Sequence, residues 1–213
     1  SSTILLGLLA LWQNQRFKNE NDATQEKLEA LSTRANELQI TSKLIEHESE
    51  RINLLRTQFQ TFFDACACNY LVADYKDTAK GEKPYAYYSI LRSSQIRTSY
   101  QVLWQQLNMD KGYNSLVDDV IKNAQRLNAS AMGLMLSFTL AQDGDTSEND
   151  TKETARQMQA QLEIEEILCK QFYAYLTDLE KERNALLFEN YTLEELQELY
   201  RKREAYTEKT SHR

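Results

Sequence analysis

Apolar residues follow alternating steps of three and four residues from Leu28 to Cys66. The d positions of this heptad pattern are large and apolar: Leu31, Leu38, Ile45, Ile52 and Phe59. The a positions are mostly small or polar: Leu28, Ala35, Ser42, Ser49 and Arg56. Five heptads of this kind indicate a long helix that has a partner along its length. No Gly or Pro occurs between Leu8 and Gly81, so the pattern predicts one unbroken helix that reaches about Tyr75.

Three further helical stripes follow, and they predict helices over about 84–109, 115–142 and 152–189. The stripe of the helix over 115–142 is Val117, Val120, Ala124, Leu127, Ala131, Leu134 and Phe138. The stripe of the helix over 152–189 is Met158, Leu162, Glu165, Cys169, Phe172, Leu176, Leu179, Arg183 and Leu186. Residues 110–114 form a tight turn in this interpretation. Thr192 and Glu195 have the spacing of a capping box, which predicts a short helix to about Tyr206.

Five Gly and one Pro in 213 residues are too few for the turns of a β-sandwich, a barrel or a βα fold. The sequence therefore predicts an all-α protein. Its architecture is an antiparallel up-down-up-down four-helix bundle with a very long N-terminal helix, which forms a coiled-coil stalk, and a short C-terminal fifth helix. The expected parts are 1–12, the end of a truncated transmembrane helix; 13–45, the stalk; 46–189, the bundle; and 190–213, the last helix and tail.

Residues 4–12 read Ile-Leu-Leu-Gly-Leu-Leu-Ala-Leu-Trp without a charge. Nine helical residues span about 14 Å, which is roughly half of a bilayer core. Because the chain begins at Ser1 without Met, we interpret the run as the end of a transmembrane helix in a single-pass membrane protein. Trp12 and Phe17 would lie at the membrane interface, with Arg16 and Lys18 next to it. Two alternatives are an apolar helix end that packs on the bundle and a remnant of a signal peptide.

The net charge is −7, which argues against nucleic acid as a partner, since phosphate binding needs a basic face. The three cysteines are a poor disulfide framework because their number is odd. Cys66 and Cys169 fall on apolar stripes and are expected in the core, whereas Cys68 is expected to be more exposed. Reduced thiols favour a membrane-anchored protein with its bulk in the cytoplasm, the alternative being the periplasm or the extracellular side.

Few residues in this chain could carry chemistry. The only histidines, His47 and His212, both lack a Glu three residues before them, which argues against a di-iron bundle site. The five glycines are isolated, so no phosphate-binding loop is present. Glu165 lies on an apolar stripe and could pair with Arg183 or Arg56 between helices. The sequence thus predicts no catalytic residue, no cofactor and no metal ligand, and we expect a non-enzymatic protein.

A cluster of tyrosines marks the start of the second predicted helix. Tyr85, Tyr87, Tyr88 and Leu91, together with the neighbouring loop over 74–83, form the candidate surface for a protein partner whose identity the sequence leaves open. The expected function is a membrane-anchored protein-interaction or assembly module. The alternative is an extracytoplasmic sensor or transducer whose bundle binds a small ligand.

The heptad pattern also predicts self-association. Leu28, Leu31, Leu38, Ile45 and Ile52 form the expected oligomer seam, through a parallel homodimer or a higher oligomer. The competing interpretation is that the short C-terminal helix covers the same seam within one chain.

Overall fold

The computed structural model describes residues 2–78, 83–111, 114–142, 148–188 and 191–211, with side chains undescribed at 2–12, 149 and 203–211. Within these residues the elements are six helices: α1 Ser2–Cys66, α2 Cys68–Thr78, α3 Tyr85–Met109, α4 Ser115–Gln142, α5 Glu148–Phe188 and α6 Leu193–Ser211. The described residues contain no strand. The all-α prediction is confirmed.

The chain divides into two compact units, and each is described by itself. The bundle unit is Glu48–Asn184, and the terminal unit combines Ser1–His47 with Ala185–Arg213. Two helices contribute to both units: α1 enters the bundle unit at Glu48, and α5 leaves it after Asn184.

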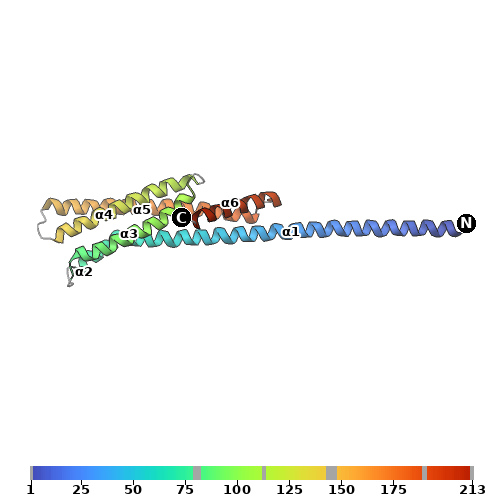
Figure 1. Ribbon diagram of the computed structural model, residues 1–213. Coiled ribbons are helices and arrows are strands. Elements are labelled where there is room, and N and C mark those ends of the chain that lie inside the picture. Colours follow the sequence, from blue (N-terminus) through green and yellow to red (C-terminus); the bar gives the residue numbers. More distant parts are fainter. Residues whose placement is uncertain (1, 79–82, 112–113, 143–147, 189–190, 212–213) are drawn as a thin grey trace. The chain divides into compact units, whose positions relative to one another are not determined.

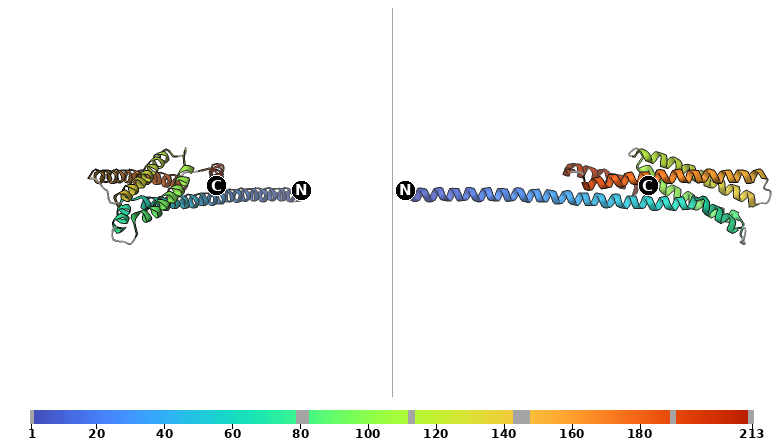
Figure 2. Two further views of the ribbon diagram at one scale, coloured as in Figure 1. Left: turned by 60° about the vertical axis from the view of Figure 1, so that its left-hand side comes forward. Right: turned by 180° about the vertical axis from the view of Figure 1, so that it is seen from behind.

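In the bundle unit, the end of α1, α3, α4 and α5 lie side by side with alternating direction (Figures 1 and 2). Aromatic contacts join neighbouring helices. Phe59 of α1 stacks on Phe172 of α5 with ring centroids 3.7 Å apart, and Phe62 of α1 lies 5.6 Å from Tyr100 of α3. The predicted up-down-up-down bundle is therefore the architecture of this unit.

Helix α4 supplies much of the core. All seven residues of its predicted stripe are buried: Val117, Val120, Ala124, Leu127, Ala131, Leu134 and Phe138. Burial of one large apolar side chain stabilises a fold by about 1.5–3 kcal/mol. The helical periodicity of this segment is regular because it contacts other helices along its whole length, so the sequence located both its bounds and its buried face.

The first helix ends earlier than predicted. We expected it to continue to about Tyr75, but α1 ends at Cys66 and α2 begins at Cys68. The reason is tertiary, because side chains of α5 bind the backbone on both sides of Ala67. No Gly or Pro marks this break in the sequence.

The heptad pattern of α1 does not lie on one face. Ile52 and Phe59 are buried in the bundle unit, whereas Leu31 and Leu38 are 67% and 57% exposed in the terminal unit. On a straight α-helix a 3.5-residue repeat drifts by about 20° per heptad, or about 80° between Leu31 and Phe59. The predicted continuous oligomer seam is therefore wrong at Ile52, which belongs to the bundle core. Ile45 is half-buried.

In the terminal unit, α6 packs against α1. Leu44 of α1 and Leu196 of α6 are both 2% exposed. The predicted capping box at the start of α6 is confirmed, since the Thr192 N–H donates to Glu195 Oε2 at 2.8 Å and the Glu195 N–H donates to Thr192 Oγ1 at 3.3 Å. Leu196 lines a small hollow together with Leu187 of α5 and Leu38 and Thr41 of α1, so α6 and the end of α5 both approach this part of α1.

Candidate functional site

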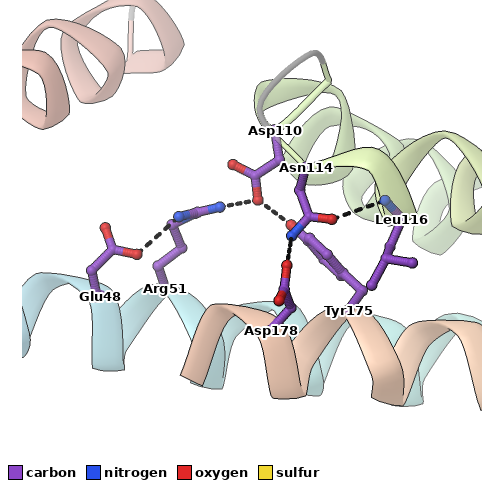
Figure 3. Close-up of polar contacts among 7 residues, drawn as sticks. All are labelled: Glu48, Arg51, Asp110, Asn114, Leu116, Tyr175 and Asp178. Atoms are coloured by element: carbon purple, nitrogen blue, oxygen red, sulfur yellow. Dashed lines mark hydrogen bonds and ion pairs between the residues drawn. The ribbon is translucent and has the colours of Figure 1, made fainter. Parts of the chain in front are cut away.

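A buried ion-pair cluster surrounds the turn between α3 and α4 (Figure 3). Arg51 of α1 donates to Glu48 at 3.0 Å and also to the carboxylate of Asp110, the residue that caps the end of α3. The hydroxyl of Tyr175, from α5, donates to the same Asp110 oxygen. One carboxylate therefore joins α1, α5 and the end of α3.

Asn114 extends this cluster to the start of α4. Its Oδ1 accepts the N–H of Leu116 at 2.9 Å, as in a helix N-cap, and its Nδ2 donates to Asp178 of α5 at 2.6 Å (Figure 3). Asn114 and Asp110 are both nearly fully buried. The cluster positions the turn predicted over 110–114, and we assign it a structural role.

A second buried polar cluster holds the break between α1 and α2. Gln161 of α5 donates to the carbonyl of Cys66 at 2.6 Å, and Glu165, one turn later, accepts the N–H of Cys68 at 2.7 Å. The Gln161 amide also donates to Glu165 at 3.4 Å and accepts from Ser130 of α4 at 3.2 Å. The backbone groups exposed by the break are thus bonded by α5.

Three thiols lie close enough to Glu165 to be affected by its charge. Burial, and secondarily the charge of Glu165, raises the pKa of Cys66, Cys68 and Cys169. Thiols with a raised pKa form little thiolate at neutral pH and are weak nucleophiles. Cys68 is 2% exposed, so the expectation that it would be more exposed is wrong.

The predicted pairing of Glu165 with Arg183 or Arg56 is also wrong. Arg56 forms an ion pair with Glu180 at 3.0 Å, and Arg183 donates to the Ser49 hydroxyl at 3.4 Å. Glu165 binds backbone and amide groups instead, because its position on α5 places it at the helix break. Burial raises the pKa of its carboxyl, and the bonds from Cys68 and Gln161 oppose that shift.

Hydrogen bonds between polar side chains join α4 and α5, and the sequence did not lead us to predict them. Asn123 donates to Gln171 at 2.7 Å, and Ser137 donates to Gln157 at 2.7 Å. With Ser130, these α4 residues recur every seventh position, and this spacing is the signal that could have identified them. Such bonds fix the register between two helices.

The predicted tyrosine surface divides into a buried and an exposed part. Tyr85 is 1% exposed and contacts the rings of Tyr75 and Phe138, so it belongs to the core and not to a contact surface. Tyr87, Tyr88 and Leu91 are exposed, and so is Ile90, at 68%. Of the neighbouring 74–83 segment, residues 74–78 lie in α2 and residues 79–82 lie outside the described part of the chain.

The described residues bear on metal binding and on membrane insertion. They contain no group of three His, Cys, Asp or Glu residues arranged to hold a metal ion. None of their helices has an apolar stretch that meets the requirements for crossing a bilayer.

A cavity of about 710 Å³ lies at one end of the bundle unit, between α2, the end of α4 and the start of α5. Apolar residues, among them Tyr75, Phe138 and Met158, line it together with the acidic residues Asp150 and Glu153. This composition suits an apolar molecule better than an anion.

Comparison of the chain with family models, curated proteins and solved structures gives no match.

Proposed function

We propose that this chain is a non-enzymatic helical-bundle protein that acts as a protein-interaction or assembly module. The observation that carries the proposal is the exposed surface at the start of α3, formed by Tyr87, Tyr88, Ile90 and Leu91. At 100° per residue Tyr87, Ile90 and Leu91 lie about 120–180° from the buried line of α3 through Tyr85 and Ile96, and Tyr88 lies about 60–80° from it. Exposed aromatic and aliphatic side chains that gather on one helix face are typical of a protein contact surface.

Contacts with α2 and with the core fix the position of this surface. Arg92 of α3 bonds Asp74 of α2 through two nitrogens, at 2.6 and 2.8 Å. Tyr85 anchors the start of the helix in the core. A preorganised surface loses little conformational entropy on binding, which favours affinity. The ammonium of Lys83 lies 4.1 Å from the centre of the Tyr87 ring, so the surface carries a positive edge.

The test compares two pairs of exposed aliphatic residues. Ile90→Ser with Leu91→Ser changes the proposed surface, and Ile167→Ser with Leu136→Ser changes exposed positions on α5 and α4. We expect proteins that co-purify with the native chain to be lost from the first variant and kept by the second, with the thermal unfolding of both unchanged. Equal recovery of the same proteins by the two variants would contradict the proposal.

Attachment to a membrane through residues 4–12 is part of the proposal, and the uncharged apolar run in the sequence supports it. The test is flotation of the chain with phosphatidylcholine vesicles. Leu6→Asp with Leu9→Asp should abolish flotation, whereas Gln13→Asp with Gln15→Asp should leave it unchanged. If both variants float equally, the run does not bind the bilayer.

We place the bulk of the chain in the cytoplasm, and the reduced, mostly buried cysteines support this compartment. The test uses the variant Thr33→Cys, which places a thiol at an exposed position. A maleimide that cannot cross the membrane is applied to intact cells, and it labels this thiol only if the thiol lies outside the cytoplasm. Labelling of this variant in intact cells would favour the periplasmic or extracellular side.

The alternative function is a sensor that binds a small apolar ligand, and the cavity at the end of the bundle unit favours it. The neutral dye N-phenyl-1-naphthylamine is a probe for such a cavity, because its fluorescence rises in apolar surroundings. Met158→Trp would fill part of the cavity and should reduce the fluorescence, whereas the exposed Leu162→Trp should not. No fluorescence increase with the native chain would remove this alternative.

A further inference from the structure

A line of exposed apolar side chains runs along α1 in the terminal unit. Among the described side chains of 13–47, four large apolar ones are more than half exposed: Phe17 at 70%, Leu28 at 60%, Leu31 at 67% and Leu38 at 57%. Each occupies an a or d position of the heptad pattern. The other large apolar side chains of this segment are buried or half-buried: Ile40, Leu44 and Ile45. All side chains over 13–36 are exposed, and the large apolar ones among them fall only at a and d positions.

The most deeply buried side of α1 in the terminal unit is a different one. The buried Leu44 marks the covered face, and Leu31 and Leu38 lie about 120–140° around the helix from it. The competing expectation, that the C-terminal helix covers the whole seam, is not met at Leu28, Leu31 and Leu38. Within one chain Leu28, Leu31 and Leu38 stay more than half exposed, although Leu38 also lines a small hollow with Leu187 of α5 and Leu196 of α6.

We propose that the exposed line on α1 is the seam of a parallel, in-register, two-stranded coiled coil with a second copy of this chain, over about residues 17–42. The seam is distinct from the α3 surface of the proposed function and does not depend on it. Ala35 and Ser42 at a positions are small and allow the two helices to approach closely.

Asparagines at a positions identify a second copy as the occupant. Continued toward the N-terminus, the heptad places Asn14 and Asn21 at a and Phe17 at d. In a parallel in-register pair, each Asn faces its own copy, and the two amides can bond to each other. A single Asn at an a position specifies both the register and the two-stranded state. An antiparallel copy would set Asn21 against Leu38 of the other helix, where its amide would have no partner.

The flanking charges agree with the parallel arrangement. The g positions are Glu20, Lys27 and Arg34, and the e positions five residues later are Gln25, Ser32 and Gln39. In a parallel pair each g residue faces the e residue of the other helix, so every charge meets a neutral side chain. In an antiparallel pair that sets Asn21 against Leu38, g faces g and Lys27 would lie next to Arg34 of the other copy. Repulsion thus disfavours the antiparallel pair.

The experiment measures the dimer dissociation constant of the full chain by sedimentation equilibrium. Leu31→Asp places a charge in the seam and should raise the dissociation constant by at least about tenfold. Thr33→Asp is the matched control, because it adds the same charge to the same turn at an exposed f position, and it should have little effect. A native chain that is monomeric at tens of micromolar, or a dimer that Leu31→Asp does not weaken, overturns the proposal.

Register is tested by disulfide formation. Under mild oxidation Ala35→Cys should form a disulfide between two copies, because equivalent a positions face each other in a parallel pair. Thr33→Cys should not, because f positions point away from the partner. Absence of the Ala35→Cys disulfide in a chain that still dimerises through Leu31 would overturn the parallel register. Asn21→Leu replaces the polar layer with an apolar one. This variant should still associate, but it should also form species larger than a dimer.

Discussion

Helix α1 carries one heptad pattern through two different environments. In Glu48–Cys66 the d residues Ile52 and Phe59 are buried, and Phe59 stacks on a ring of α5. In the segment before Glu48 the d residues Leu31 and Leu38 are mostly exposed. On a straight helix the d residues of successive heptads point in gradually different directions. An unbroken 3-4 pattern can therefore place its first residues and its last residues on different faces of the same helix.

Polar groups differ between the two regions in the same way. In the bundle unit, buried polar side chains bond across helices, as Arg51 does with Asp110 and Gln161 with the Cys66 carbonyl. In the terminal unit, the ion pairs of α1 are local and exposed, as between Arg16 and Glu20. Local helix pairs of this kind contribute about 0.3–0.5 kcal/mol each. The bundle unit therefore depends on tertiary bonds, and the ion pairs in the first part of α1 support only its local helical structure.

The comparison is tested most strongly by truncating one d residue in each region. Phe59→Ala should reduce the free energy of unfolding by about 3–5 kcal/mol, because it removes a buried ring and leaves a cavity. Leu31→Ala should change it by less than about 0.5 kcal/mol, as a surface substitution does. Urea denaturation at a concentration at which the chain is monomeric gives both values. Similar losses for the two variants would mean that the Leu31 position is covered within a single chain.

The ion pairs give the next largest effect. Asp110→Ala leaves Arg51 buried without its shared carboxylate and should reduce the free energy of unfolding by about 3 kcal/mol or more. Glu180→Ala removes the partly exposed pair with Arg56, also between α1 and α5, and should cost at most about 1 kcal/mol. Equal costs, measured by urea denaturation, would show that the Asp110 cluster does not anchor the turn.

Features with a local signal were predictable from the sequence. The stripe of α4 from Val117 to Phe138 was correct because a helix buried along one face repeats its apolar positions regularly. The capping box at Thr192 and Glu195 was correct because its bonds join residues three positions apart. The oligomer seam through Leu28, Leu31 and Leu38 stays a prediction, and its extension to Ile52 is wrong because that residue is buried in the bundle core.

Features that depend on distant residues were not predictable. The break at Ala67 depends on Gln161 and Glu165 of α5, and nothing in the nearby sequence marks it. The same applies to Tyr85, which the sequence does not distinguish from Tyr87. Its burial follows from its contact with Phe138 of α4, which only the folded chain brings next to it.

The helix break itself gives a smaller effect. Gln161→Leu removes bonds to the Cys66 carbonyl and the Ser130 hydroxyl, and each buried polar group left unbonded costs about 1–3 kcal/mol. The control is Gln157→Leu, which removes one half-buried bond to Ser137 and should cost less. Urea denaturation gives both free energies of unfolding. A smaller loss for Gln161→Leu than for Gln157→Leu would contradict a tertiary origin of the break.

The smallest expected effect is on the pH dependence of stability. It distinguishes two glutamates that each accept a backbone N–H at the start of a helix. Glu165 in the bundle unit accepts the N–H of Cys68 at the start of α2, and Glu195 in the terminal unit accepts the N–H of Thr192 before α6. Burial raises the pKa of Glu165 above its usual value of 4.5, whereas at the exposed Glu195 the hydrogen bonds from Thr192 lower the pKa. The two groups must therefore contribute to stability with opposite dependence on pH.

For Glu165, the native state binds the proton more tightly than the unfolded state, so its contribution to stability is full below pH 4.5 and is lost as the pH rises through the raised pKa. The stability of Glu165→Gln relative to the native chain should therefore increase as the pH rises from 4.5 toward neutrality. For Glu195 the contribution is present above pH 4.5 and is lost as the pH falls through the lowered pKa, so Glu195→Gln should gain on the native chain only under acid conditions. Urea denaturation across this pH range measures both differences. A pH dependence of the same sign for the two variants would mean that burial does not separate these helix-start carboxylates.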